Sequence, residues 1–331
     1  MNKIEFGDCR EIMRKWAQEG VKAQTCVTSP PYFGLRDYGH EGQIGLEQTP
    51  EEYIVAMVEV FRCVRDVLAD DGTLWLNIGD SYASTGGKSQ PHRNNNGGFS
   101  GSDGKRTQGY AQAAGGFERP NTIRDDLKPK DLIGIPWMLA FALRADGWYL
   151  RQDIIWHKPN PMPESVRDRC TKAHEYIFLL SKSESYFYDH EAVKEPCVNT
   201  RKPGRKIRDT RETHGTGGGN SGINNLLARY HNGDMPTHRN RRSVWEVATV
   251  PYKGAHFATF PPALIEPCIL AGSRPGDVVL DPFMGSGTTA YVAAKNGRRY
   301  LGCELNKDYR SLQDARLESL GGLFLLGADN A

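Results

Sequence analysis

Residues 278–290 read VVLDPFMGSGTTA and place a buried strand, a glycine turn and the start of a helix in immediate succession. Glycines 285 and 287 let the backbone bend sharply and approach a ligand closely. The spacing up to Ala290 satisfies the Gly-x-Gly-x-x-Ala pattern of dinucleotide-binding turns, and Glu304, ending the next predicted strand, can accept hydrogen bonds from ribose hydroxyls. No Lys-Ser or Lys-Thr pair follows, which excludes a phosphate-binding loop. The stretch predicts a site for an adenosine-bearing cofactor, although the glycines alone also fit a structural turn.

Helices and strands alternate along most of the chain, as the crossover connections of an α/β sheet require. Between positions 50 and 68 the apolar residues keep helical spacing, and the first turn carries Pro50 and two acids, which favours a helix start. Short apolar runs predict strands. The expected strands are 3–6, 25–28, 73–78, 149–156, 278–280 and 300–303, and the expected helices are 10–19, 50–68, 132–144, 262–271, 288–296 and 307–320.

A second informative element is the corner Ser29-Pro30-Pro31-Tyr32, which directly follows a predicted strand. Consecutive prolines fix their φ angles and lack N–H donors, so the carbonyls of Ser29 and Pro30 can face a site as acceptors on a stiff backbone. Tyr32 adds a flat ring for stacking, and Ser29 adds a hydroxyl acceptor. The corner alone also fits a simple proline turn. Together with the glycine turn, it predicts a site that binds the amino group of an aromatic ring.

Two long segments interrupt the α/β pattern. From 84 to 118 glycine fills nine of 35 positions, a composition that predicts a mobile loop. From 201 to 242 ten Lys and Arg face three Asp and Glu, a balance of +7, whereas the whole chain has a net charge of +2. Positive charge is therefore concentrated in one segment, as binding to a DNA backbone requires. We expect residues 1–183 and 244–331 to form a catalytic domain and 184–243 a recognition insertion.

Several protein classes are excluded by composition. The 331-residue chain has enough apolar residues for a core, at 38%, and no run long enough to span a membrane. Its first ten residues lack the layout of a signal peptide, so a cytoplasmic location is expected. The seven cysteines are scattered without any Cys-x-x-Cys pair, which argues against a disulfide framework and against a structural metal site.

Taken together, the two motifs resemble those of the DNA amino-methyltransferases that use S-adenosylmethionine. That family carries Asp/Asn/Ser-Pro-Pro-Tyr/Phe, here residues 29–32, and Phe-x-Gly-x-Gly, here residues 283–287. The catalytic motif comes first, and a basic region separates it from the cofactor motif, which is similar to the β group of the family. Other similar blocks are 7–9, 72–80, 156–163, 174–176, 256–261 and 302–304.

The resemblance implies a Rossmann-like methyltransferase sheet with a permuted motif order and an inserted DNA-recognition region. It implies that Ser29, Pro30, Pro31 and Tyr32 are catalytic. The Ser29 hydroxyl and Pro30 carbonyl would accept both protons of an exocyclic amino group and free its lone pair to attack the sulfonium methyl. Implied cofactor-binding residues are Asp8 at the adenine, Cys9, Phe260, Asp281, Pro282, Phe283, Gly285, Ser286, Gly287, Thr288, and Glu304 at the ribose.

The implied partner is double-stranded DNA, with the target nucleotide flipped out of the stack and held against Tyr32. Trp156 is a candidate second wall and an equally good candidate for the core, while Lys158 would neutralise a phosphate or be solvated. The candidate DNA-binding residues are Trp156, Lys158, Arg201, Lys202, Arg205, Lys206, Arg239, Arg241 and Arg242.

The identity of the base stays open at this point. A serine at position 29 leans toward cytosine N4, whereas the 156–163 and 174–175 blocks look like those of adenine-N6 enzymes, so adenine is marginally favoured. A nicotinamide dehydrogenase and a non-catalytic DNA-binding module are remote alternatives. A symmetric dimer would suit a palindromic site, and a restriction endonuclease partner, if one exists, would be a separate chain.

Overall fold

The computed structural model describes residues 2–35, 37, 39–40, 42–85, 87–88, 118–119, 121–124, 126–197, 237–249 and 260–327. The chain divides into two compact units, one formed by residues 1–188 and 243–331 and the other by residues 189–242. Most of the basic segment and most of the segment 84–118, for which the sequence predicts a mobile loop, lie outside the described residues.

The larger unit is built on an eight-stranded sheet with the order β1-β12-β11-β2-β3-β7-β6-β10. From β1 to β3 neighbouring strands are parallel, whereas β7 runs antiparallel to both β3 and β6. The strands are β1 (Asn2–Phe6), β2 (Ala23–Thr28), β3 (Leu68–Ile78), β6 (Tyr149–His157), β7 (His174–Ser181), β10 (Val244–Glu246), β11 (Val278–Asp281) and β12 (Arg299–Glu304). The predicted α/β class is confirmed.

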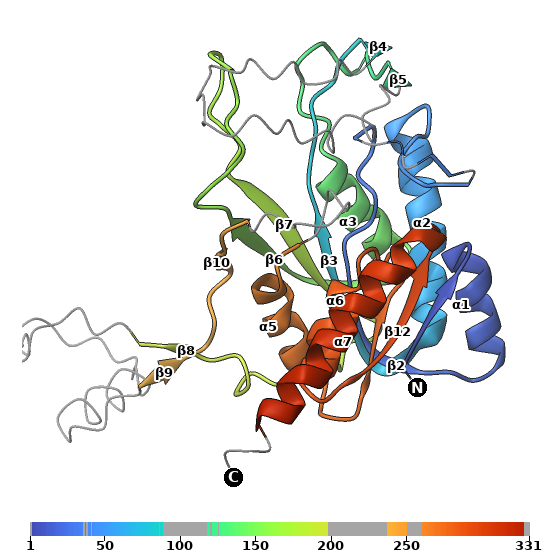
Figure 1. The fold of residues 1–331 in the computed structure, drawn as a ribbon. Helices are drawn as coiled ribbons and strands as arrows, with labels where there is room; N and C mark the ends of the chain where they lie inside the picture. Colours follow the sequence, from blue (N-terminus) through green and yellow to red (C-terminus); the bar gives the residue numbers. More distant parts are fainter. Residues whose placement is uncertain are drawn as a thin grey trace, which may run out of the picture. The chain divides into compact units, whose positions relative to one another are not determined.

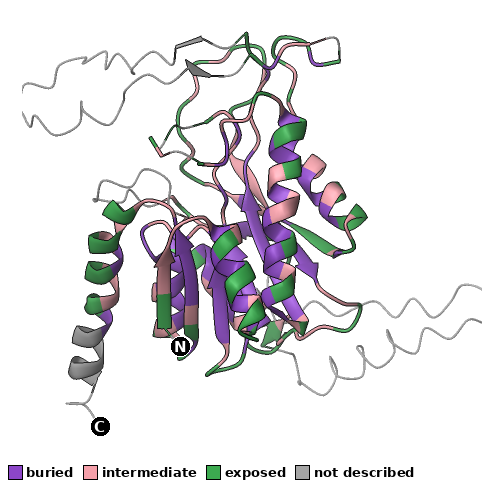
Figure 2. Ribbon diagram, turned by 90° about the vertical axis from the view of Figure 1, so that its right-hand side faces the viewer, coloured by how far each residue is buried: buried purple, intermediate pink, exposed green. Residues whose placement is uncertain are grey.

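Helices cover the sheet on both faces (Figures 1 and 2). On one face α1, α2 and α3 pack beside one another, and on the other α5 and α6 contact the central strands while α7 packs against α6. Figure 2 shows the strands as largely buried ribbons between helices with exposed outer surfaces. The helices are α1 (Cys9–Gln18), α2 (Pro50–Val67), α3 (Ile135–Ala145), α5 (Pro262–Gly272), α6 (Thr288–Lys295) and α7 (Arg310–Gly327).

Local sequence explains where the first helices begin. Thr49 caps α2 by accepting a hydrogen bond from the Glu52 N–H at 3.2 Å, and the Glu52 carboxylate accepts in return from the Thr49 N–H. Asp8 caps α1 in a similar way, with its carboxylate 2.7 Å from the Arg10 N–H. These side chains satisfy backbone donors that a helix start leaves without partners.

The structure departs from the sequence-based elements in several places, and the short strands β4, β5, β8, β9 and β10 were not expected. Strand β7 was not expected, because its buried apolar run lacks a polar alternation. Helix α2 ends at Val67 and β3 begins at Leu68, so Asp71 and Gly72 lie inside a strand rather than between elements. Helix α3 starts at Ile135 and not at 132, because Gly134 at φ 86° forms its N-cap. A 3₁₀ turn at Lys307–Tyr309 precedes α7, which extends to Gly327.

The second unit contains a short antiparallel pair, β8 (Glu195–Pro196) with β9 (His238–Arg239). A further short pair in the first unit joins β4 (Gly87–Lys88) to β5 (Glu118–Arg119). No helix within the described part of the chain combines the length and the apolar character needed to cross a membrane.

Candidate functional site

The two predicted motifs follow neighbouring strands of the sheet. Strand β11 pairs in parallel with β2, with Val279 opposite Thr25 and Leu280 opposite Cys26. Parallel strands end at the same edge of a sheet, where ligands of α/β proteins bind. The corner 29–32 and the glycine turn 283–287 therefore start side by side at one edge.

The same edge collects the ends of most other strands in this sheet. Strands β1, β12 and β3 run parallel to β2 and β11. Strand β7 runs the opposite way, so its first residues lie at this edge, and β6 again ends here. The same edge of the sheet therefore also carries Asp8, Glu304, Lys158 and Glu175, which lie at or next to the ends of β1, β12, β6 and β7.

A buried carboxylate ties the two motif strands together. Asp281, at the end of β11, accepts hydrogen bonds from Thr28 Oγ1 at 2.7 Å, Thr289 Oγ1 at 2.6 Å and the Phe283 N–H at 3.0 Å. The side chain is 1% exposed, and burial raises the pKa of Asp281 to about 6 despite these donors. Asp281 thus links the residue before the proline corner to the first turn of α6.

The glycine turn has the backbone that its sequence predicts. Gly285 at φ 54° and Gly287 at φ 82° occupy the left-handed region, which costs a glycine nothing and any other residue free energy. Gln313 of α7 donates to the Gly285 carbonyl at 2.7 Å. The hydroxyl of Ser286 is buried and has no hydrogen-bond partner among the described residues. An unpartnered buried hydroxyl in a glycine turn marks a place where a ligand can supply the missing partner.

Glu304 closes the turn from the neighbouring strand. Its carboxylate accepts from the Gly285 N–H at 2.7 Å and from the Asn306 N–H at 2.8 Å. The side chain is 9% exposed, and burial raises the pKa of Glu304 to about 7, against the lowering effect of the two N–H donors. The carboxyl group therefore titrates near neutral pH.

The other predicted cofactor residues lie at the start of α1, just before α5 and within or next to the glycine turn. Asp8 is engaged by Arg10, whose guanidinium lies 2.6 Å away and lowers the pKa of that carboxyl. Cys9 is buried at the start of α1, and burial raises the pKa of its thiol to about 12. Phe260 is half-buried directly before α5. Pro282 is buried within the turn, Phe283 is half-buried, and the Thr288 hydroxyl accepts from Arg316.

The proline corner is held in place from behind. Tyr53 of α2, fully buried, donates its hydroxyl proton to the Pro31 carbonyl at 2.9 Å. The Pro30 carbonyl has no hydrogen-bond donor among the described residues. The Ser29 hydroxyl and the Pro30 carbonyl are therefore the candidate acceptors of this corner.

A group of polar residues that sequence reasoning missed lies beside Tyr32. The Tyr32 hydroxyl donates to Glu175 Oε2 at 2.8 Å and lies 3.4 Å from Asn77 Oδ1, while Ser29 Oγ lies 3.5 Å from the Tyr32 oxygen. Burial, reinforced by the Glu175 charge, raises the pKa of Tyr32 well above its usual value. The half-buried ring packs against Gly79, where an added Cβ would lie 2.7 Å from Tyr32 Cε2.

Lys158 and Trp156 are less available to DNA than expected. Lys158 forms an ion pair with Glu175, and its ammonium lies 4.2 Å from the centre of the Trp156 ring. Trp156 is 4% exposed, and its indole N–H donates to the Val247 carbonyl at 2.8 Å. Trp156 is therefore a core residue, which is one of the two roles expected for it.

The basic residues of the second unit are only partly described. Arg239 and Arg242 both donate to the Glu195 carboxylate, at 2.8 and 2.6 Å. Arg241 is half-buried. Arg201, Lys202, Arg205 and Lys206 lie outside the described residues.

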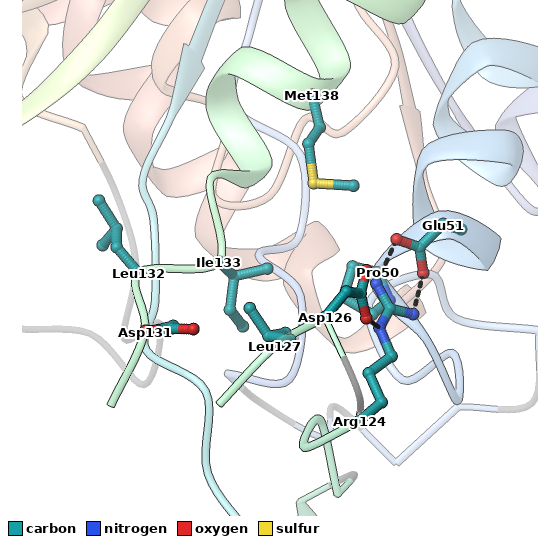
Figure 3. A pocket seen from close by; sticks show the side chains of 9 residues that line it. All are labelled: Pro50, Glu51, Arg124, Asp126, Leu127, Asp131, Leu132, Ile133 and Met138. Carbon is teal, nitrogen blue, oxygen red and sulfur yellow. Dashed lines mark hydrogen bonds and ion pairs between the residues drawn. The ribbon is translucent and has the colours of Figure 1, made fainter. Parts of the chain in front are cut away.

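A pocket of about 390 Å³ lies apart from the two motifs, where the start of α2 meets residues 124–133 (Figure 3). Arg124 bridges its rim by pairing with Glu51 at 2.5 Å and with Asp126 at 2.8 Å. Ile133 and Met138 add apolar walls. None of its lining residues belongs to either motif.

Comparisons with known proteins agree with the resemblance. The family model for N6/N4 methyltransferases, described as DNA methylase, matches residues 23–314. The chain is 47% identical to the Type II methyltransferase M.SmaI of Serratia marcescens over 315 residues, which cover 95% of this chain and 90% of the relative. It is 46% identical to M.Cfr9I of Citrobacter freundii, with 94% and 86% covered.

Solved structures share the fold at lower sequence identity. The PvuII DNA methyltransferase (cytosine-N4-specific) matches with a TM-score of 0.57 at 17% identity, over 96% of this chain and 86% of that one. The M1.HpyAVI-SAM complex matches with a TM-score of 0.53 at 17% identity, over 96% and 100%. These matches set aside the dehydrogenase and the non-catalytic module, since a family model covering most of the chain and relatives close to half identical point the same way. The chain belongs to the DNA methylase family.

Proposed function

We propose that this chain uses the edge that carries both motifs to transfer a methyl group from S-adenosylmethionine to the exocyclic amino group of a base flipped out of double-stranded DNA. The observation that carries the proposal is the parallel pairing of β2 with β11, which starts the acceptor corner and the glycine turn side by side. S-adenosylmethionine supplies an electrophilic methyl group on a sulfonium.

The residues of the glycine turn fit such a cofactor. Ser286 offers a buried hydroxyl without a described partner, and the left-handed glycines keep side chains out of the space before α6. The Glu304 carboxylate, at the end of the next strand, is the acceptor suited to ribose hydroxyls. We further propose that Asp8 contacts the adenine of the cofactor and that Phe260 covers the bound cofactor.

The corner supplies acceptors where an amino group needs them. An exocyclic amino nitrogen is conjugated with its ring and is therefore a poor nucleophile. When Ser29 Oγ and the Pro30 carbonyl accept its two protons, the nitrogen can turn toward tetrahedral geometry and direct its lone pair at the methyl carbon. Tyr53 supports this geometry by holding the next carbonyl, that of Pro31.

The proposed substrate is the amino group of adenine or of cytosine, because both bases present an N–H pair beside a ring nitrogen acceptor. The 156–163 and 174–175 blocks favour adenine N6, and Ser29 favours cytosine N4. We keep the marginal preference for adenine. Reaching either atom requires flipping the nucleotide, and the half-buried Tyr32 ring is the stacking surface we propose.

The test is incubation of the protein with duplex DNA and tritiated S-adenosylmethionine, followed by digestion and chromatography of the nucleosides. We expect the label in N6-methyladenine or N4-methylcytosine, which also assigns the base. Label in 5-methylcytosine, or no label in DNA that lacks prior methylation, would contradict the proposal.

Cofactor affinity is expected to depend on pH through Glu304. Because burial raises the pKa of Glu304 to about 7, the group is mostly neutral at pH 6 and mostly ionised at pH 8. A carboxylate accepts ribose hydroxyl protons more strongly than the neutral acid does, so affinity for S-adenosylmethionine should rise about tenfold over this range. Calorimetric titrations at pH 6, 7 and 8 measure the effect. Glu304→Gln is the matched control, because it removes titration at position 304 and leaves any titration of the ligand unchanged, and an equally steep rise in that variant would refute this role.

We also propose that the second unit, residues 189–242, contacts the DNA. Its segment 201–242 carries the +7 balance, and Arg239 and Arg242 share one carboxylate, Glu195, which is 20% exposed as a side chain. The ion pairs partly neutralise two arginines that would otherwise face phosphates. Glu195 therefore sets how much of the positive charge acts on DNA.

Glu195→Gln is expected to tighten binding to non-specific duplex DNA several-fold at low salt and to steepen the salt dependence by about one phosphate contact. Fluorescence anisotropy measures the affinity and its salt dependence. Titrations at about 50 to 200 mM salt cover the range in which counterion release changes the affinity. Glu191→Gln in the same unit is the control, because Glu191 pairs with Lys194 and not with these arginines. Unchanged affinity in Glu195→Gln would contradict the proposed contact.

The remaining expectations stay predictions. They are a symmetric dimer, a restriction endonuclease partner on a separate chain and a cytoplasmic location.

A further inference from the structure

We propose that Glu175 is the terminal proton acceptor of the transfer reaction, reached from Ser29 through the hydroxyl of Tyr32. This inference rests on the proposed function, since it concerns the proton that the amino group must lose. Three oxygens carry it: Ser29 Oγ is 3.5 Å from Tyr32 Oη, and Tyr32 Oη is 2.8 Å from Glu175 Oε2. The donors point in one direction, from serine to tyrosine to carboxylate.

The need for an acceptor follows from the chemistry. The lone pair of the amino nitrogen forms the new N–C bond, and the electrons of the broken C–S bond stay on sulfur. As the N–C bond forms, the nitrogen becomes strongly acidic, and its surplus proton passes to Ser29 Oγ in the same step. The serine proton passes to Tyr32 Oη, and the tyrosine proton passes to Glu175, which becomes a neutral acid.

Two other described carboxylates near this edge of the sheet, those of Asp80 and Asp281, accept hydrogen bonds from groups outside the corner 29–32. Both oxygens of Asp80 accept from the Gly134 N–H, at 3.0 and 3.1 Å, and one of them also accepts from the Ser81 and Ile135 N–H groups. Asp281 contacts Thr28 and Thr289 rather than Ser29. Glu175 is therefore the carboxylate in hydrogen-bond contact with the catalytic corner, within the part of the chain that the structure describes.

The surroundings of Glu175 suit an ionised acceptor that later releases its proton. Lys158 pairs with its second oxygen, and the two side chains are 18% and 16% exposed, so charge is compensated and solvent is near. Asn77 Nδ2 lies 3.4 Å from Oε2. The nearby titratable groups are Lys158, Tyr32, Lys172 and His174. Burial, reinforced by the charge of Lys172, lowers the pKa of His174.

Two isosteric variants interrupt the relay at different points. Tyr32→Phe keeps the ring for stacking and removes the hydroxyl, and Glu175→Gln keeps the shape and removes the acceptor. In single-turnover reactions we expect each variant to lose at least about tenfold in methyl-transfer rate, with affinities for S-adenosylmethionine and DNA near those of the wild type. The double variant should lose no more than either single one, because both changes break the same chain of oxygens.

A readout specific to proton transfer separates the relay from a structural role. In both variants the proton must leave through solvent, so the rate should rise with the concentration of a small buffer base at constant pH and ionic strength. The wild type should show no such rise. Tyr53→Phe is the matched control, because it removes a phenol hydroxyl bonded to the same corner but outside the relay. Any loss in Tyr53→Phe should be independent of buffer.

The outcomes distinguish this inference from the function on which it rests. If the wild type labels no amino group in DNA, the proposed function fails. If the wild type labels DNA and the two variants react within about twofold of it, or lose rate additively without buffer dependence, the relay is wrong.

Discussion

Ser29→Ala should lower the rate of methyl transfer by about 10²–10³-fold, the usual cost of removing one preorganised partner from a reacting group. The hydroxyl is an acceptor that the structure leaves available to an amino group, 3.5 Å from the Tyr32 oxygen. Alanine removes it without disturbing the prolines that follow. Cofactor affinity should stay within about twofold, because the glycine turn is formed by a different strand.

Pro31→Ala should produce a similar loss for a different reason. The variant keeps a carbonyl at this position but lets φ vary in the corner. The carbonyl that accepts from Tyr53 at 2.9 Å is then no longer held by a rigid backbone. Single-turnover incorporation of tritium, measured alongside equilibrium binding of the cofactor, checks both variants. Normal turnover in either one would refute the acceptor corner, and loss of cofactor binding would point to misfolding instead.

The second large effect concerns Asp281. Asp281→Ala leaves the hydroxyls of Thr28 and Thr289 and the Phe283 N–H without their acceptor in a site that is 1% exposed. We expect a loss of about 3 kcal/mol in the free energy of unfolding, since each buried donor left unpaired costs about 1–3 kcal/mol and hydroxyls can partly find new partners. Urea unfolding followed by circular dichroism measures the difference.

Asp281→Asn provides the matched control, because it keeps one acceptor oxygen and the volume of the side chain. The stability of the wild type, measured against this variant, should depend on pH in a defined direction. Burial raises the pKa of Asp281 to about 6, so the contribution of the acid to stability is full below pH 4 and declines as the pH rises through 6. The stability difference between wild type and Asp281→Asn should therefore shrink from pH 5 to pH 8. A loss below about 1 kcal/mol in Asp281→Ala would show that the link between the strands is unimportant.

Much of the fold could be read from local patterns. Most strands and helices fall within a few residues of their expected positions, because apolar spacing, Pro50 and the Thr49 cap act within one turn of a helix. Strand β7 was not predicted, because it is buried along most of its length and its sequence lacks the alternation of apolar and polar residues that marks a half-exposed strand. Its antiparallel course could not be anticipated from a run of apolar residues.

The candidate site divides in the same way. Ser29, the prolines, the glycines and Glu304 could be named beforehand because their chemistry lies in short stretches. Glu175 could not, since its contact with Tyr32 joins positions 143 residues apart. One signal was available: two titratable residues, His174 and Glu175, at the start of an otherwise apolar run are unusual enough to examine as a site.

By itself, the order of residues determined the two turns, their backbone conformations and the class of chemistry they serve, because proline fixes φ and glycine permits the left-handed φ values that other residues avoid. Tertiary structure alone decided that β2 lies next to β11, that Asp281 reaches Thr28 across 253 positions, and that β7 brings Glu175 to Tyr32. Strand order depends on how distant apolar faces are buried together, and no short stretch of sequence carries that information.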